Sequence, residues 1–149
     1  MKKTNLVIVG VGALVVLALY ILFGTTVNTS AAKIIETCAI EGDKSACYER
    51  EVPELLGTLS LGQVFDVIRE IRVRDSSYQF CHVLAHALGE RTVAEDPERW
   101  IDAMSKNPSD GLCSNGYIHG VVGGKFRSEV LDAETLELFL PDFSRACEP

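Results

Sequence analysis

The sequence lacks the short motifs that mark the most familiar enzyme classes. It contains no HExxH zinc motif, no Walker phosphate loop, no GxSxG nucleophile elbow and no GxGxxG dinucleotide fingerprint. It has no CxxCH, so covalent attachment of a c-type haem is disfavoured. Strand-like alternation of apolar and polar residues is almost absent. These absences leave enzyme activity open and favour an all-α fold.

Positive charge is scarce beyond the first few residues. The chain has 14 Lys and Arg and 21 Asp and Glu, and only two of these charges, Lys2 and Lys3, precede residue 31. Residues 31–149 therefore carry a net charge of −9. Such a domain repels phosphate backbones, which predicts that it has no nucleic-acid partner. A polybasic lipid-binding surface is disfavoured for the same reason.

The longest apolar run predicts a membrane anchor. Residues 6–23 read LVIVGVGALVVLALYILF, which is 18 residues without a charge. A helix of this length measures about 27 Å, close to the thickness of a bilayer's hydrocarbon core. Lys2 and Lys3 precede the run, and positive charge tends to stay in the cytoplasm, so the N-terminus is expected inside. A cleaved signal peptide is the alternative, with a weak cleavage site at Ser30-Ala31-Ala32.

The predicted protein is a single-pass membrane protein with one small domain in the periplasm or outside the cell. Residues 1–30 form the cytoplasmic stub, the transmembrane helix and a polar linker within GTTVNTSAA (24–32), and residues 31–149 form the domain. Its fold class is all-α, with short helices held by disulfides. Helix start signals are Asp43, the capping box of Ser60 and Gln63, Ser76 or Ser77, Asp96 before Pro97, and Asp132 before a helix that ends at Pro141.

All three histidines lie in two segments that begin with cysteine. The first is CHVLAHALGE (81–90) and the second is CSNGYIHG (113–120). On a helix, His82, His86 and Glu90 recur every four residues and share one face. The first segment is therefore predicted to present two histidines and a carboxylate in one row.

Small residues in both segments predict a close helix crossing. They recur every four residues, as Cys81, Ala85 and Gly89 in the first segment and as Gly116, Gly120 and Gly124 in the second. Glycine inside a helix is unfavourable by about 0.5–1 kcal/mol relative to alanine, unless close backbone packing offsets it. We expect the two small faces to pack, which would bring His119 near His82 and His86. The alternative is a partly looped GYIHGVVGG in which the glycines supply positive φ.

The same crossing predicts a cysteine pairing. It would bring Cys81 to Cys113, while Cys38 and Cys47 flank a short loop. An exported domain favours disulfides, so these two pairs are the predicted bridges. Cys147 is then left over, either unpaired or available to a protein partner.

Three histidines in this arrangement predict a metal site. Two on one helix and a third from another element can hold a divalent transition metal and leave one position open, with zinc the first choice and copper or iron as alternatives. Glu90 is a candidate fourth ligand or catalytic base, which would make the protein a metal-dependent hydrolase. A disulfide-stabilised interaction module with structural histidines is the main alternative. Non-covalent haem is a further alternative.

The two motifs, CHVLAHALG and CSNGYIHG, carry a resemblance over about residues 60–125. The chain resembles exported or membrane-anchored proteins of uncharacterised families that pair CHxxxHxxG with a later CxxGxxHG. The resemblance implies no particular activity. It does imply a further Cys/Gly/His segment, and because this chain stops two residues after Cys147, a C-terminal truncation is expected.

Overall fold

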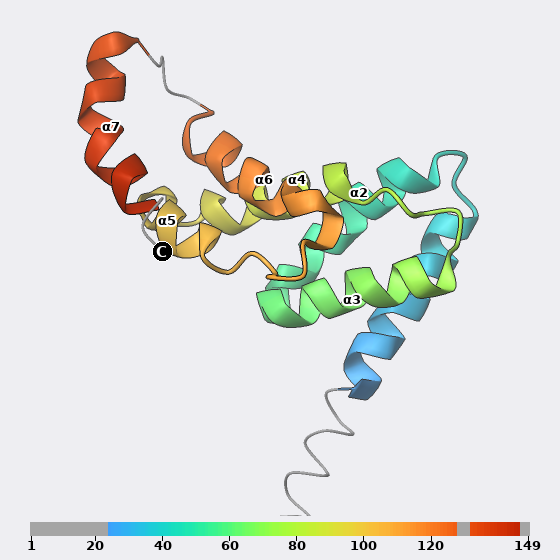
Figure 1. Cartoon of the computed structure of the whole chain (residues 1–149). Coiled ribbons are helices and arrows are strands. Elements are labelled where there is room, and N and C mark those ends of the chain that lie inside the picture. Colours follow the sequence, from blue (N-terminus) through green and yellow to red (C-terminus); the bar gives the residue numbers. More distant parts are fainter. Residues whose placement is uncertain (1–23, 128–131, 147–149) are drawn as a thin grey trace, which may run out of the picture.

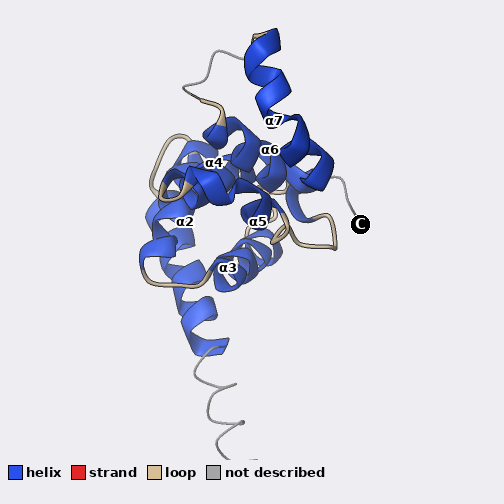
Figure 2. Ribbon diagram, turned by 90° about the vertical axis from the view of Figure 1, so that its left-hand side faces the viewer, coloured by secondary structure: helices blue, strands red, loops and turns tan. Residues whose placement is uncertain are grey.

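The computed structural model describes residues 24–127 and 132–146, and within them every regular element is helical (Figure 2). This confirms the all-α prediction. After a helix over residues 24–39, the elements are α2 (Lys44–Glu54), η1 (Leu55–Gly57), α3 (Leu61–Arg74), α4 (His82–Ala94), η2 (Pro97–Arg99), α5 (Trp100–Met104), η3 (Leu112–Asn115), α6 (Gly116–Lys125) and α7 (Ala133–Ala146).

The predicted transmembrane run, residues 6–23, lies outside the described residues. Within the described part of the chain, no helix combines the length and the apolar character needed to cross a bilayer. Residues 24–32 are helical, so the predicted linker was wrong. Ala31, Ile34 and Cys38 are buried at helical spacing, and this one-sided burial fixes the helix against the domain.

Two predicted helix starts are confirmed. The Asp43 carboxylate accepts a hydrogen bond from the backbone N–H of Ala46 at 3.1 Å, at the start of α2. Ser60 and Gln63 form the complete capping box of α3. Each side chain satisfies a backbone N–H that the first helical turn leaves without a partner.

Two helix limits differ from the prediction. α4 begins at His82 rather than near Ser76 or Ser77, because the Ser77 hydroxyl and N–H both donate to the Asp75 carboxylate and hold the chain in a turn. α7 does start after Asp132, which accepts a hydrogen bond from Thr135 N at 2.8 Å. It continues through Pro141, however.

The continuation of α7 has a packing reason. Phe139 and Phe143 lie one turn apart on either side of Pro141 and contact Phe126, with ring centroids 4.9 and 5.7 Å away. Phe143 also contacts Trp100, which is 1% exposed and belongs to the core. This aromatic burial outweighs the hydrogen bond that a proline removes from the helix.

The core lies between α4 and its neighbours. α4 and α6 run side by side, and α2 packs against α4 (Figure 1). Both predicted disulfides are confirmed: Cys38–Cys47 and Cys81–Cys113 have Cα–Cα distances of 5.5 and 5.0 Å. Cys147 lies outside the described residues.

A buried carboxylate ties α2 to the end of α3. Asp75 accepts hydrogen bonds from the Tyr48 hydroxyl at 2.7 Å and from the Lys44 ammonium at 3.2 Å, besides those from Ser77. The Ser77 hydroxyl and then the Tyr48 hydroxyl hold the pKa of Asp75 well below its usual range, because they stabilise the ionised form. Sequence patterns gave no sign of this network.

Candidate metal centre

α4 and α6 meet along four glycines, Gly89, Gly116, Gly120 and Gly124, here called the glycine seam. A Cβ on Gly120 would overlap the His86 carbonyl and lie 2.8 Å from the His86 Cα. One on Gly89 would lie 2.7 Å from the Val121 nitrogen. The two backbones are therefore in direct contact, with no layer of side chains between them.

The small face of α4 is shorter than predicted. Ala85 does belong to the crossing, since it is 1% exposed and its Cβ lies 3.2 Å from the position that a Cβ on Gly116 would take. Cys81 does not continue this helical face, because it precedes the first residue of α4 and forms the disulfide to Cys113. The prediction of a three-residue series was therefore wrong at Cys81, and α4 contributes Ala85 and Gly89 to the contact with α6.

The order of the contacts along the seam gives the helix direction. Gly116 faces His82, Gly120 faces His86, and Gly124 faces Glu90, so both chains advance in the same direction. α6 is helical from Gly116 onward, and within the described residues the positive φ values fall before it. The alternative in which GYIHGVVGG is partly a loop is therefore wrong.

The seam brings the three histidines together. Ligand-competent atoms of His82, His86 and His119 all lie within 4.8 Å of one another. Their ring centroids are 4.8 to 5.3 Å apart. His82 and His86 are half-buried and His119 is exposed. Within the described residues, this is the one group of His, Cys, Asp or Glu side chains close enough to hold an ion.

His82 is oriented by the backbone. Its Nδ1 lies 3.0 Å from the Cys113 carbonyl oxygen, which only accepts hydrogen bonds, so Nδ1 carries a proton, and in the neutral ring the lone pair is then on Nε2. That Nε2 lies 3.1 Å from Nε2 of His86. Two nitrogens bound to one tetrahedral ion at 2.0–2.1 Å would be about 3.3 Å apart. Metal-bound histidines commonly donate their second ring nitrogen to a carbonyl in this way.

The carbonyl that orients His82 belongs to an unusual turn. Cys113, Ser114 and Asn115 have φ values of 54°, 53° and 58°, the left-handed region, although none is glycine. Each such residue is unfavourable by about 1–2 kcal/mol. The Cys81–Cys113 disulfide and a 2.9 Å hydrogen bond from the Asn107 amide to Asn115 Oδ1 hold the turn. Sequence patterns missed it, because nothing but glycine signals this conformation reliably.

Electrostatics favour the ligand form of His86. Burial lowers the pKa of His86, and positive charge on His82 and His119 lowers it further, while Glu90 opposes them. A lowered pKa keeps the imidazole neutral at pH 7, the form that coordinates a metal.

Glu90 continues the row of His82 and His86, but it forms an ion pair with Arg127. Its carboxylate is not part of the three-histidine group. Arg127 was missed at the sequence level, although the signal was present: His119, Gly123 and Arg127 recur every four residues, as His82, His86 and Glu90 do.

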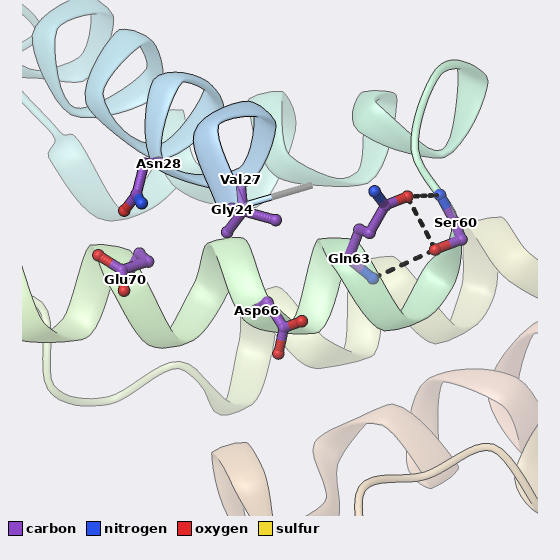
Figure 3. Close-up of a pocket in the computed structure, with 7 residues that line it drawn as sticks. All are labelled: Gly24, Val27, Asn28, Ser60, Gln63, Asp66 and Glu70. Carbon is purple, nitrogen blue, oxygen red and sulfur yellow. Dashed lines mark hydrogen bonds between the residues drawn. The ribbon is translucent and has the colours of Figure 1, made fainter. Parts of the chain in front are cut away.

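A cavity lies elsewhere, between the helix of residues 24–39 and α3 (Figure 3). Among the residues that the structure describes, its lining includes Asp66 and Glu70 but no histidine or cysteine, so they do not offer the ligands found at the seam. Comparison of the chain with protein-family models, with curated proteins and with solved structures finds no match. What the protein does is therefore inferred from its own residues and their geometry.

Proposed function

We propose that this chain is a metal-binding protein whose ion is held by His82, His86 and His119. The observation that carries the proposal is the convergence of three ring nitrogens from two helices within 4.8 Å. These are all the histidines in the chain. The hydrogen bond from His82 Nδ1 to Cys113 supports it, because in the neutral ring this bond leaves the lone pair on Nε2, the nitrogen that faces His86.

The ligand set favours zinc, with copper or iron as the alternatives. Three neutral imidazoles on a tetrahedral ion leave one position for water or another ligand, and zinc commonly takes this arrangement. Non-covalent haem fits poorly. Axial ligands on opposite faces of one iron would be about 4 Å apart, twice a metal–nitrogen bond, so His82 and His86, whose Nε2 atoms are 3.1 Å apart, are too close to be that pair.

Two other functions are less well supported. In an interaction module with structural histidines, each ring would bond to the backbone, but within the described part of the chain only the ring of His82 is held by a carbonyl. A hydrolase with Glu90 as base would need that carboxylate at the open position, and Arg127 engages it instead. Both stay alternatives that metal analysis tests.

We place the domain outside the cytoplasm, carried by the apolar run at residues 6–23 as a single-span anchor. The two disulfides support this location, because cytosolic thiols are usually kept reduced. A topology map with a reporter fused after residue 40 tests it. Cytoplasmic signal from that fusion would contradict the placement.

The test of the metal site is the binding of Zn²⁺ to the purified full chain, measured by competition with a chromophoric chelator. One equivalent is expected to bind. His119→Ala should weaken binding by more than about 100-fold, since even residues behind the ligands contribute about 10–100-fold. Because the His119 side chain is exposed, the His119→Ala variant should stay folded, and circular dichroism checks this.

Arg91→Ala is the matched control, because Arg91 is an exposed α4 residue whose nearest acid, Glu54, is 3.6 Å away. It should bind Zn²⁺ like the wild type. Equal affinity in the wild type and His119→Ala would overturn the three-histidine site.

A further inference from the structure

The surroundings of the histidines point to the ligand at the open metal position, an inference that depends on the proposed metal site. Because α4 and α6 advance together, the row His82–His86–Glu90 lies beside the row His119–Gly123–Arg127. Glu90 lies one helical turn beyond His86 on α4, and its partner Arg127 follows the end of α6, eight residues after His119.

Between the histidines and this ion pair, the surface is open at Gly123. A Cβ built on Gly123 meets no heavy atom within 4 Å, in contrast to Gly120 and Gly124. Gly123 is exposed, so the space faces solvent. A cavity between α2 and α4 lies beside the ion pair, and its lining includes Glu90 and Arg127 but neither Gly123 nor a histidine.

Arg127 is positioned to add a directed contact to a bound anion. Its side chain is 70% exposed, whereas that of Glu90 is 35% exposed. A guanidinium carries five N–H donors in a planar fork, so one carboxylate partner does not exhaust them. A carboxylate has two oxygens, so it can place one on the metal ion and let the other accept a hydrogen bond from Arg127.

We propose that the open position of the metal site binds small carboxylate anions, with one oxygen on the ion and the other accepting from Arg127. A single negative charge fits better than a double one, because Glu90 stands beside Arg127 and residues 31–149 carry a net charge of −9. Gly123 provides the room for the anion.

The experiment uses the full chain loaded with Co²⁺, whose visible absorption reports the ligands on the ion, titrated with acetate. The wild type should show a saturable spectral change. Arg127→Gln should raise the acetate Kd about tenfold, the usual size of one hydrogen bond between charged groups. Glu90→Gln should lower the Kd, because it removes the competing carboxylate. The double variant Arg127→Gln/Glu90→Gln should also bind acetate weakly. It tests whether the loss in Arg127→Gln arises because the released Glu90 carboxylate binds the ion itself.

Two control variants test whether the effects are local. Arg99→Gln removes an equally exposed arginine, 68% against 70%, that pairs with Asp102. It should leave the acetate Kd unchanged. Gly123→Leu should block acetate while Co²⁺ affinity stays as in the wild type.

The outcomes separate this inference from the metal site. A chain that takes up no Co²⁺ overturns both. A chain that binds Co²⁺ normally but gives no acetate response, or the same acetate Kd in Arg127→Gln as in the wild type, overturns the carboxylate site alone. Tighter binding of phosphate than of acetate overturns the preference for a single charge.

Discussion

The two disulfides hold regions of different character. Cys38–Cys47 spans nine residues and joins the helix of residues 24–39 to α2, beside the buried Asp75 network. Cys81–Cys113 spans 32 residues and joins the residue before α4 to the left-handed turn before α6. Both close a helix junction, but one of the cysteines in the second pair also presents its carbonyl to His82.

The comparison shows that the same kind of bond has different roles. Cys38–Cys47 joins two helices of the core, whereas Cys81–Cys113 also fixes the position of His82. Cross-linking a longer loop removes more freedom from the unfolded chain, about 1 kcal/mol more for 32 residues than for nine. That gain is modest. The distinguishing property of the second bridge is its neighbours, since Cys81 precedes His82 directly and Cys113 belongs to the turn that orients it. The comparison predicts that the two regions respond to mutation in separable ways.

The largest effect is expected in the glycine seam. Gly120→Leu should lower the free energy of unfolding by about 4 kcal/mol or more, because the new side chain meets the His86 backbone, which cannot move aside. Zn²⁺ binding should be lost with it. Urea unfolding followed by circular dichroism measures the first effect, and chelator competition the second.

Gly123→Leu supplies the matched comparison, on the same helix but facing open space. It should stabilise the chain slightly, by up to about 1 kcal/mol, since leucine is the better helix former. Equal destabilisation by both variants would show that α4 and α6 do not pack along this seam.

The next effect separates the two bridges. Replacing Cys81 and Cys113 by alanine, or Cys38 and Cys47 by alanine, should lower the free energy of unfolding by about 2–4 kcal/mol in each case. Only the first pair should weaken Zn²⁺ binding in the molecules that remain folded, because it frees the turn that holds His82. The Zn²⁺ affinity of both double variants, measured at low temperature to keep them folded, tests this prediction. Equal losses of affinity would erase the distinction between the regions.

The smallest effect concerns Asp75. Asp75→Asn should lower the free energy of unfolding by about 2 kcal/mol at pH 7, since charge-assisted hydrogen bonds become neutral ones. The folded-state pKa of Asp75 lies below that of the unfolded chain, so its contribution is complete above about pH 4 and disappears as pH falls further. Between about pH 2 and 7, the free energy of unfolding should therefore change less with pH in the variant than in the wild type.

Asp66→Asn, at an exposed α3 carboxylate paired with Arg69, is the control and should change little. Neither variant should affect Zn²⁺ binding. A loss of metal affinity in Asp75→Asn would mean that the two regions are coupled.

Much of this architecture could be predicted from local rules. Asp43 and Ser60 act as helix caps through contacts within four residues, which sequence spacing encodes directly. The spacing of the glycines and of Ala85 likewise encoded a backbone-to-backbone crossing, and with it the approach of His119 to His82.

The failures depend on contacts that helix-start and helix-stop signals do not encode. The start of α4 depends on Asp75, which bonds to Ser77 two residues later and is itself held by Tyr48 of α2. The length of α7 depends on aromatic contacts to Phe126 on either side of Pro141. The left-handed turn at Cys113 has no residue signature, because a disulfide and tertiary hydrogen bonds hold it.

The unequal exposure of the histidines has a kinetic consequence. In the proposed site, α4 contributes two recessed rings, one of them fixed by Cys113, and α6 contributes one ring in contact with solvent. Water can replace His119 more readily than the other two, so an ion would enter and leave on the α6 side. The residence time of the metal in the proposed site would then depend mainly on how fast the His119 ring of α6 leaves the ion.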